Sequence, residues 1–321
     1  MSTYIQVPRI ENLDDLAFHT HLSKSKLYKL IFHADRHYKK YWQPKKTGGK
    51  RLIMAPNKEL KVVQWWILRN ILDRVPPMPV AKGFVRNQSI LSNVLPHKQN
   101  NYFVCIDIED FFPSIKYGRV FKVYETIGYN KRVAHMLTSL CTCEGVLPQG
   151  GVTSPSLSNL VCVRLDRRLH IAASKWGVTY TRYADDITFS SNRATALAPM
   201  KSLAEEILRD EGFKINARKT RFMGPARQRR ITGLILGDTP EGNRLVGVGK
   251  QRQRYLRAAI HKLAVAQLSA EERRHLINHI SGWLAYLHGV DPQRYQNLLF
   301  YIAKIEAKYD TKLEIAIPKS Q

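Results

Sequence analysis

Apolar segments that end in carboxylates constrain the fold of this chain more than any other feature. Tyr102–Ile108 is rich in aromatic and β-branched residues, which is typical of a buried strand, and Asp107 lies at its end. Val178–Ser191 contains two more apolar segments on either side of Asp185 and Asp186, which predicts a hairpin with acids at its turn. A pair of aspartates at a turn is, taken alone, most often ordinary turn chemistry. Carboxylates gathered at the ends of such strands, however, repel one another unless a cation lies nearby.

The rest of the chain is strongly basic. It has 51 Lys and Arg residues against 26 Asp and Glu residues, a net charge of +25. Its 44% hydrophobic content excludes a disordered basic tail, and 321 residues suffice for two or three packed units. A folded protein with this charge usually binds a polyanion such as nucleic acid.

Nothing in the sequence indicates secretion or a membrane. No apolar run approaches the roughly 18 residues that a membrane span needs, and Met1–Asp14 has no charged leader followed by an apolar stretch. The four cysteines show neither CxxC spacing for zinc nor a small disulfide framework. We therefore expect a cytoplasmic protein with reduced thiols and no membrane contact.

The order of predicted elements indicates an α+β fold with a mainly antiparallel sheet. Apolar spacing predicts helices at Leu13–Phe18, Lys24–Phe32, Lys58–Val75, Leu157–Ala172, Met200–Leu208, Lys250–Ala266, Ala270–Leu287 and Pro292–Tyr309. Extended segments are predicted at Tyr38–Trp42, Arg51–Met54, Tyr102–Ile108, Val178–Tyr183, Ile187–Ser191 and after Gly212. A basic turn, Lys45–Lys50, joins the first two, and the turn cluster Asp238–Gly242 places a domain boundary near residue 240.

Acids grouped at strand ends in a basic chain suit nucleotidyl transfer. Oxygen ligands and a nearby polyphosphate favour Mg²⁺, which is held by one or two carboxylates together with phosphate oxygens. Two such ions, about 3.5–4 Å apart, activate an attacking hydroxyl and stabilise a leaving pyrophosphate. We therefore expect two Mg²⁺ ions as cofactors.

Four blocks resemble the motifs of reverse transcriptases and occur in that family's order. Tyr183–Asp186 resembles the signature hairpin, and Asp107–Phe112 resembles the first-aspartate motif. Within Leu147–Asn159 the family's template- and nucleotide-contacting motif is matched, and Gly212–Thr220 resembles the fourth palm motif. The resemblance implies a right-hand polymerase fold with fingers, palm and a helical thumb, deoxynucleoside triphosphates as substrates, and RNA-templated DNA synthesis.

The same resemblance divides the chain into three functional parts. It implies fingers at residues 1–82 and 115–150, a catalytic palm at 83–114 and 151–240, and an RNA- or duplex-binding thumb at 241–321.

Two further blocks resemble segments characteristic of bacterial retron reverse transcriptases. They are Asn93–His97, with Val94 where alanine is usual, and Ile231–Gly233, with Ile231 where valine is usual. This resemblance implies that a structured non-coding partner RNA is copied into single-stranded DNA from one of its own 2′-hydroxyls, leaving a branched RNA–DNA product (msDNA). It also implies a role in anti-phage defence with a separate effector protein.

Roles for individual residues follow from the matched motifs. Asp107 and Asp185 would hold both metals, and Asp186 would support the ions or the primer end. The Phe112 ring would lie beneath the sugar and exclude a ribose 2′-hydroxyl; ordinary core packing is its alternative. Arg51 would grip the triphosphate, because arginine pairs well with phosphate oxygens.

The remaining nucleotide contacts come from two motifs. Gln149 and Gly150 would line the nucleotide site, since glycine permits close backbone approach and the glutamine amide can donate or accept. Lys219 would either protonate the leaving pyrophosphate or contact primer phosphates, and the sequence does not separate these roles.

Basic residues predict the path of bound nucleic acid. Gly212–Gly237 contains seven Lys or Arg residues and no Asp or Glu, which suits a track of phosphate contacts. The predicted contacts on this segment and the following helix are Arg218, Arg221, Arg229, Arg230, Lys250, Arg254 and Arg257.

Aromatic residues outside the motifs allow two interpretations. Residues flanking the Gly289–Pro292 turn could present rings and a guanidinium to unpaired bases, or could pack between helices. These residues are Tyr286, His288, Arg294 and Tyr295. Trp65 and Trp66 fall in an amphipathic helix, and we expect them in the core.

Three other functions compete with a retron enzyme. Reverse transcriptases of diversity-generating elements and of group II introns share the catalytic motifs. A non-catalytic RNA-binding scaffold would be expected to lack the acids that are present here. An RNA-dependent RNA polymerase is disfavoured by Phe112 and by Ala184, where glycine is usual in such enzymes.

Overall fold

The chain forms two compact units. The computed structural model describes residues 6–45, 48–238 and 244–318. One unit consists of Met1–Gln88 and Val104–Phe222, and the other of Ser89–Phe103 and Met223–Gln321. Part of the predicted basic turn, at Lys46, and most of the predicted turn cluster Asp238–Gly242 lie outside the described residues. No helix within the described ranges is long and apolar enough to cross a bilayer.

The first unit begins with helices and one hairpin. Its helices up to residue 141 are α1 (Leu13–Thr20), α2 (Lys24–Phe32), α3 (Lys58–Asn70), α5 (Phe111–Ser114), α6 (Tyr117–Ile127) and α7 (Lys131–Cys141). The side chains that cap helix N-termini here are Asn12, Ser23, Asn57 and Asn130, each accepting from backbone N–H groups of the first turn. Helices α6 and α7 were not predicted, although each buries one apolar face, which is a periodic signal in the sequence.

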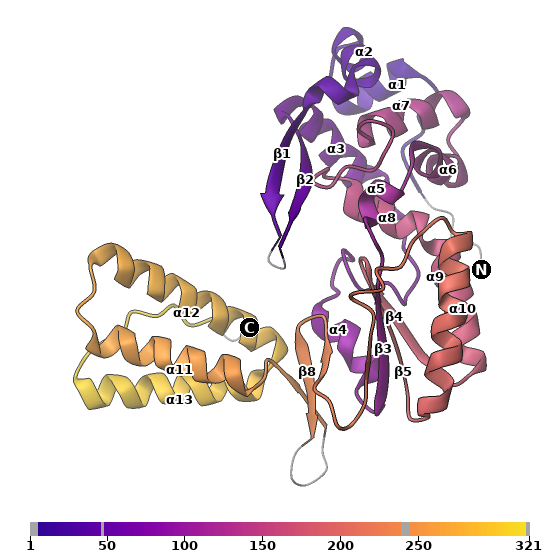
Figure 1. Ribbon diagram of the computed structural model, residues 1–321. Coiled ribbons are helices and arrows are strands. Elements are labelled where there is room, and N and C mark those ends of the chain that lie inside the picture. The colour runs from indigo at the N-terminus through magenta and orange to yellow at the C-terminus, as the bar shows by residue number, and fades with distance from the viewer. Residues whose placement is uncertain (1–5, 46–47, 239–243, 319–321) are drawn as a thin grey trace. The chain divides into compact units, whose positions relative to one another are not determined.

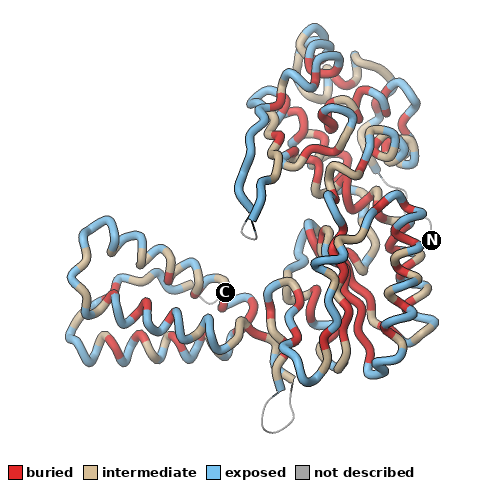
Figure 2. The backbone as a smooth tube through the Cα atoms, viewed as in Figure 1, coloured by how far each residue is buried: buried red, intermediate tan, exposed pale blue. Residues whose placement is uncertain are grey.

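The first two predicted extended segments form an antiparallel hairpin. Strand β1 (Tyr38–Pro44) pairs with β2 (Lys50–Pro56), from Tyr38 opposite Pro56 to Pro44 opposite Lys50. Figure 2 shows this hairpin as largely exposed, with Met54 among its few buried residues. The prediction of two strands is confirmed.

Helix α3 is shorter than predicted. A single helix was expected over Lys58–Val75, but α3 ends at Asn70 and a 3-10 turn, Leu72–Arg74, follows. Val75 is extended, with φ −104° and ψ 104°. A residue that precedes proline clashes with the proline ring in the helical conformation, which accounts for the extended Val75 but not for the end of α3 at Asn70.

A four-stranded sheet forms the centre of the first unit. Its strand order is β4-β5-β3-β6. The strands are β3 (Tyr102–Asp107), β4 (Thr179–Tyr183), β5 (Asp186–Ser191) and β6 (Arg221–Met223). The hairpin partners β4 and β5 are antiparallel, with Tyr183 opposite Asp186. The strands β3, β4 and β5 are buried along most of their length (Figure 2), as expected for strands covered on both faces.

Helices cover this sheet. The helices α8 (Ser154–Val161), α9 (Val163–Lys175) and α10 (Leu197–Asp210) follow in the chain, and α9 and α10 pack side by side against β4 and β5 (Figure 1). One helix had been predicted over Leu157–Ala172, but Cys162 separates two. Apolar spacing continues across this one-residue break, so the pattern alone could not reveal it.

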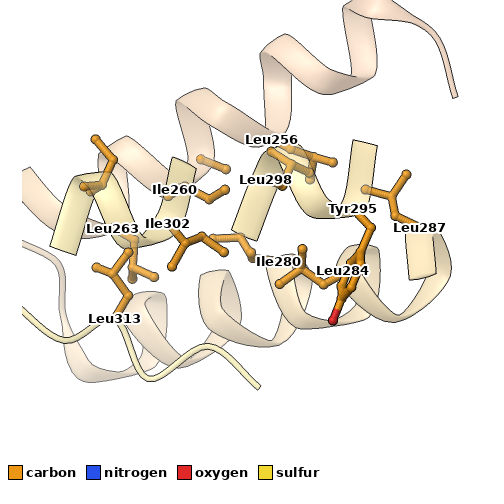
Figure 3. Close-up of a cluster of buried hydrophobic side chains, with 12 residues drawn as sticks. Leu256, Ile260, Leu263, Ile280, Leu284, Leu287, Tyr295, Leu298, Ile302 and Leu313 are labelled. Carbon is orange, nitrogen blue, oxygen red and sulfur yellow. The ribbon is translucent and has the colours of Figure 1, made fainter. Parts of the chain in front are cut away.

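The second unit combines a small sheet with three long helices. Its elements are α4 (Ile90–Val94), β7 (Arg229–Ile231), β8 (Leu234–Asp238), β9 (Arg244–Gly247), α11 (Lys250–Val265), α12 (Ala270–Val290) and α13 (Pro292–Tyr309). The three helices were predicted almost to the residue. They share a buried cluster in which Leu256, Ile280 and Leu298 represent one helix each (Figure 3). The sheet β7-β8-β9 was not predicted, because its strands have only three to five residues each and give no clear periodic signal.

The two retron-like blocks meet inside the second unit. Thr232 and Gly233 both have positive φ, at 44° and 91°, and form the two-residue turn between β7 and β8. The Asn93 side-chain amide donates to the Thr232 hydroxyl at 3.5 Å. His97 is fully buried and its ring lies 6.4 Å from that of Phe103. Both blocks therefore act in the packing of this unit.

The burial of His97 predicts an acid-sensitive fold. Burial lowers the pKa of His97 to about 3, whereas an unfolded histidine titrates near ~6.5. Protonation therefore favours the unfolded chain, and stability that is complete above pH ~6.5 falls as the pH drops toward 3. Between about pH 7.5 and about pH 5, wild type should lose about 2 kcal/mol more unfolding free energy than His97→Gln in urea titrations.

The exposed histidine His275 on α12 provides the matched control. His275→Gln should keep the wild-type pH dependence. Parallel losses in wild type and His97→Gln would show that His97 does not carry this effect.

Candidate active site

The predicted catalytic aspartates lie at neighbouring strand ends. Asp107 is the last residue of β3 and is 8% exposed. Asp186 is the first residue of β5, and Asp185 precedes it in the turn from β4. The N–H of Ile108 donates to the Asp185 carbonyl at 3.0 Å, which ties the end of β3 to this turn. The structure thus brings all three predicted carboxylates together.

These carboxylates are electrostatically unfavourable as a group. Loss of hydration raises the pKa of Asp185, and the negative charge of Asp107 adds to the effect. Loss of hydration, followed by the charges of Asp185 and Asp107, raises the pKa of Asp186 to about 6, although that residue keeps an exposed surface. No group of three or more His, Cys, Asp or Glu side chains in the described ranges is arranged to hold a metal ion. Positive charge is therefore what this site most needs.

Lys219 supplies positive charge within the site. Its ammonium donates to both carboxylate oxygens of Asp107, at 3.0 and 2.9 Å. This hydrogen bond raises the pKa of Lys219, so the side chain stays charged. The Lys219 side chain is 56% exposed, which leaves it room to move toward another anion. Lys219, a predicted nucleotide contact, is thus hydrogen-bonded to Asp107, a predicted metal ligand.

The turn that carries Asp185 and Asp186 packs against a glycine. Ala184 has φ +58°, and a Cβ added to Gly83 would lie 2.5 Å from the Ala184 nitrogen, so only glycine fits at position 83. The Lys82 N–H donates to the Arg182 carbonyl at 2.7 Å, and the Arg182 N–H donates to the Val80 carbonyl at 2.9 Å. Backbone on both sides of the glycine therefore fixes the strand that leads into the turn.

A buried ion pair supports the same turn. The Arg182 guanidinium donates to Asp166 from Nε at 2.8 Å and from Nη2 at 2.7 Å, and both side chains are fully buried. Its Nη1 donates to the Ala184 carbonyl and to the Asn159 amide oxygen, each at 3.0 Å. The Asn159 amide in turn donates to the Gly83 carbonyl at 2.9 Å. One arginine thus links helix α9, helix α8 and the catalytic turn.

Sequence reasoning missed this pair. Arg182 interrupts an otherwise apolar strand just before the turn, and Asp166 lies between Leu165 and Leu169 on the buried face of α9. A charged residue at a predicted core position was the available signal, and it indicates a buried partner.

The predicted nucleotide loop packs against β2. The Met54 N–H donates to the Gln149 carbonyl at 2.9 Å. Gly150 has φ +121°, and a Cβ there would lie 3.0 Å from the Met54 carbonyl oxygen. Fully buried Gln64 accepts from the Val152 N–H at 3.0 Å, which anchors the end of the loop. Arg51 lies on the same strand as Met54, and its Nε donates to Gln43 on β1 at 3.1 Å.

Phe111 and Phe112 have different environments. Phe111 is 4% exposed and packs against Phe213, which fits a core residue. Phe112 is half-buried, and its ring centroid lies 6.1 Å from that of exposed Phe84. Phe112 therefore keeps surface available for a substrate, as its predicted role requires.

Most of the predicted RNA contacts lie on the surface. The exposed ones are Arg218, Arg221, Arg230, Lys250, Arg254 and Arg257. Arg229 is different: it is 4% exposed and forms an ion pair with Asp238 across the β7–β8 hairpin. Its assignment as an RNA contact does not fit this burial, because its guanidinium already neutralises Asp238, which follows the acid-free segment Gly212–Gly237 directly.

For the aromatic residues outside the motifs, one prediction is wrong and one open alternative is decided in part. Trp65 is 42% exposed beneath the Arg69 guanidinium, and only Trp66 is partly buried, so the pair is not core. Tyr295 is 4% exposed in the helical cluster, while Arg294 pairs with Asp291. For these two residues of the second unit the packing interpretation is correct.

The Arg182–Asp166 pair generates a stability prediction. Arg182→Met leaves the buried Asp166 carboxylate without its counter-charge, although the Tyr180 hydroxyl still donates to it, and should lower the unfolding free energy by about 3–5 kcal/mol. The double variant Arg182→Met/Asp166→Leu should recover most of that loss, because an apolar pair removes the uncompensated charge. DNA synthesis should stay low in both, since the Ala184 carbonyl loses its donor. Urea unfolding and primer extension measure the two effects.

Either of two results would contradict this account. A double variant as unstable as Arg182→Met would show that the buried charge is not the source of the instability. A double variant with wild-type synthesis would show that the turn does not need the arginine.

Comparison with known proteins identifies the family of this chain. Residues 43–236 match the family model described as reverse transcriptase (RNA-dependent DNA polymerase). That range contains Asp107, Asp185, Asp186 and Lys219. The predicted α+β right-hand polymerase fold is confirmed by this match and by the mixed helices and antiparallel sheets.

Several relatives are retron enzymes. The chain is 39% identical over 305 residues to Retron Ec86 reverse transcriptase of Escherichia coli, covering 94% of this chain and 92% of that protein. It is 32% identical over 330 residues to Retron Mx162 reverse transcriptase of Myxococcus xanthus, covering 93% and 68%. Retron Ec73 reverse transcriptase of Escherichia coli is 32% identical over 277 residues, covering 81% and 85%. The chain belongs to the retron reverse transcriptases and is an RNA-directed DNA polymerase.

Proposed function

We propose that DNA synthesis takes place at Asp107, Asp185 and Asp186. The observation that carries this proposal is the meeting of three carboxylates at adjacent strand ends, with the Lys219 ammonium bound to one of them. A structural cluster of acids would be expected to carry its own permanent counter-charges. Here the Lys219 ammonium that pairs with Asp107 belongs to a side chain that is 56% exposed and can move to another anion.

The three carboxylates supply oxygen donors of the kind that divalent cations prefer. Hydration loss and mutual repulsion raise the pKa values of Asp185 and Asp186, so their ionised forms are disfavoured. A bound cation would stabilise these ionised forms. Asp107 and Asp185 would hold both Mg²⁺ ions, with Asp186 supporting them. When bound, such ions make the attacking hydroxyl a better nucleophile and stabilise charge on the leaving pyrophosphate.

Other residues of the first unit would bind and orient the deoxynucleotide. Arg51 would pair with its triphosphate, and the Gln149–Gly150 backbone, already fixed against β2, would line its pocket. Phe112 would lie beneath the sugar and exclude a ribose 2′-hydroxyl by steric conflict. Lys219 would move from Asp107 to the phosphates, where its proton is available to the leaving group.

Removing one carboxylate charge tests the catalytic proposal. Asp185→Asn keeps the side-chain shape but removes a charged ligand, so extension of a primed RNA template should fall at least about a hundredfold. RNA binding should change less than about twofold, because it depends on the basic surface. Exposed Glu109 lies two residues beyond Asp107 and gives the matched control, Glu109→Gln, which should extend normally. Near-normal extension by Asp185→Asn would reject the assignment.

We further propose the priming chemistry of this enzyme. Its relatives are named as retron reverse transcriptases, and this supports copying of a structured non-coding RNA from an internal 2′-hydroxyl, with a branched RNA–DNA product. The three-part division into fingers, palm and thumb, a cytoplasmic location in a bacterium, a separate effector protein and a role in anti-phage defence belong to the same proposal.

Periodate treatment of the RNA tests this priming. Periodate destroys the 3′-terminal diol of an RNA but leaves internal 2′-hydroxyls intact. RNA transcribed from DNA adjoining the chain's own gene should therefore support undiminished DNA synthesis after oxidation. A generic RNA primer annealed to a template should lose extension after the same treatment, which controls for the oxidation. Loss of synthesis with both RNAs would reject internal priming while leaving polymerisation intact.

A further inference from the structure

The second unit contains a cavity that the catalytic site does not use. It has a volume of about 350 Å³ and lies between the β7–β8 hairpin and the first turns of α11, with α12 closing one side. Its lining includes three cationic and three aromatic side chains: Arg230, Lys250, Arg252, Tyr255, Trp283 and Tyr286. No Asp or Glu is among its lining residues.

The aromatic wall of this cavity combines an edge-to-face ring pair with a guanidinium that lies over one ring. Trp283 and Tyr286 meet edge to face, with centroids 5.3 Å apart and planes at 84°. The Arg252 guanidinium lies over the Trp283 ring, 4.5 Å from its centroid. A planar ligand can extend this stack, because purines and pyrimidines stack on both aromatic rings and guanidinium planes.

The shape of the cavity is set by packing that tolerates little change. Gly249 has φ +84°, and a Cβ there would lie 2.4 Å from the Ile235 side chain. Next to it, the Val248 N–H donates to Asp291 at 3.2 Å, and Asp291 also pairs with Arg294. Trp283 packs on the buried helical cluster shown in Figure 3. The rings are therefore held in place before a ligand arrives, which lowers the entropy lost on binding.

Charge and rings together specify the ligand. Three cations without an acid favour an anion, and the rings favour a flat, polarisable group; a nucleotide has both properties. The volume is at the small end of the range for ligand sites, roughly 300–1,000 Å³, and suits one nucleotide better than a helical segment. Bases inside a duplex have both faces covered by neighbours, so only an unpaired base can enter.

We propose that this cavity binds one unpaired nucleotide of the RNA that the enzyme copies, with its base on the Trp283–Arg252 stack and its phosphate near Arg230 and Lys250. The proposal rests on the proposed function, which supplies the RNA. It gives the enzyme a means of preferring RNAs that expose a loop or bulge, which backbone contacts alone do not provide.

Binding of two RNA probes by the full-length protein tests this proposal. One probe is a pool of RNA hairpins with randomised loops, and the other is a fully paired RNA duplex of the same stem. Trp283→Ala should weaken hairpin binding about tenfold, the loss expected for one stacked base, and should change duplex binding less than about twofold. Trp283→Phe, which keeps a ring, should restore most of the hairpin affinity.

Phe300 provides the matched control. It is an aromatic residue of the same helical unit, 75% exposed on α13 and outside the cavity lining. Phe300→Ala should bind both probes as wild type does. Equal losses on hairpin and duplex in Trp283→Ala, or no loss on the hairpin, would overturn the proposal.

A second variant and one further measurement separate the possible failures. Arg252→Gln leaves Trp283 in place and serves as the test if Trp283→Ala proves unstable. It should also lose affinity for the hairpin but not for the duplex. An Arg252→Gln variant with no such selective loss would likewise overturn the proposal. Extension of a primed RNA template by wild type is measured on the same preparation. Normal extension without hairpin selectivity rejects the cavity alone, whereas no extension by wild type rejects the proposed function.

Discussion

The buried ion pair between Arg182 and Asp166 is the constraint on which the active site depends. Its desolvation is expensive, and the cost is offset only because both carboxylate oxygens and the guanidinium nitrogens have well-aligned partners. Those partners include the Ala184 carbonyl and Asn159, so the pair that stabilises the palm-like sheet also positions the catalytic turn. A site built on backbone carbonyls and a rigid arginine keeps its carboxylates close together despite their repulsion.

Local patterns were sufficient for the parts of the fold that repeat along the chain. The strand ending at Asp107, the two strands that flank Asp185, the hairpin β1–β2 and the three long helices all follow from apolar spacing and turn residues. What the patterns could not show is which charges are buried. Arg229 and Arg230 are adjacent and look equivalent in the sequence, yet only Arg230 lies on the surface. Arg229 is buried, and it pairs with Asp238 across a hairpin. Partners that meet only through folding leave no periodic signal.

The two sequence blocks that resemble retron enzymes have a packing role in the second unit. The Asn93–His97 and Ile231–Gly233 blocks meet in the second unit, where they form a tight turn, a side-chain contact and a buried neutral histidine. Their role is to hold the small sheet whose hairpin lines the cavity described above. Through Gly233, the turn that carries one of these blocks also contributes to the wall of the cavity for which nucleotide binding is proposed.

Gly83 extends the functional centre to a residue that has no side chain. Its hydrogen occupies the only space that the nitrogen of Ala184 leaves free, far away in the chain. A larger residue at this position would clash with the backbone of Ala184, although Gly83 itself has no side chain with which to perform chemistry. In an enzyme engineered from this scaffold, the segment bearing Gly83 must be kept together with the turn at Ala184 that it packs against.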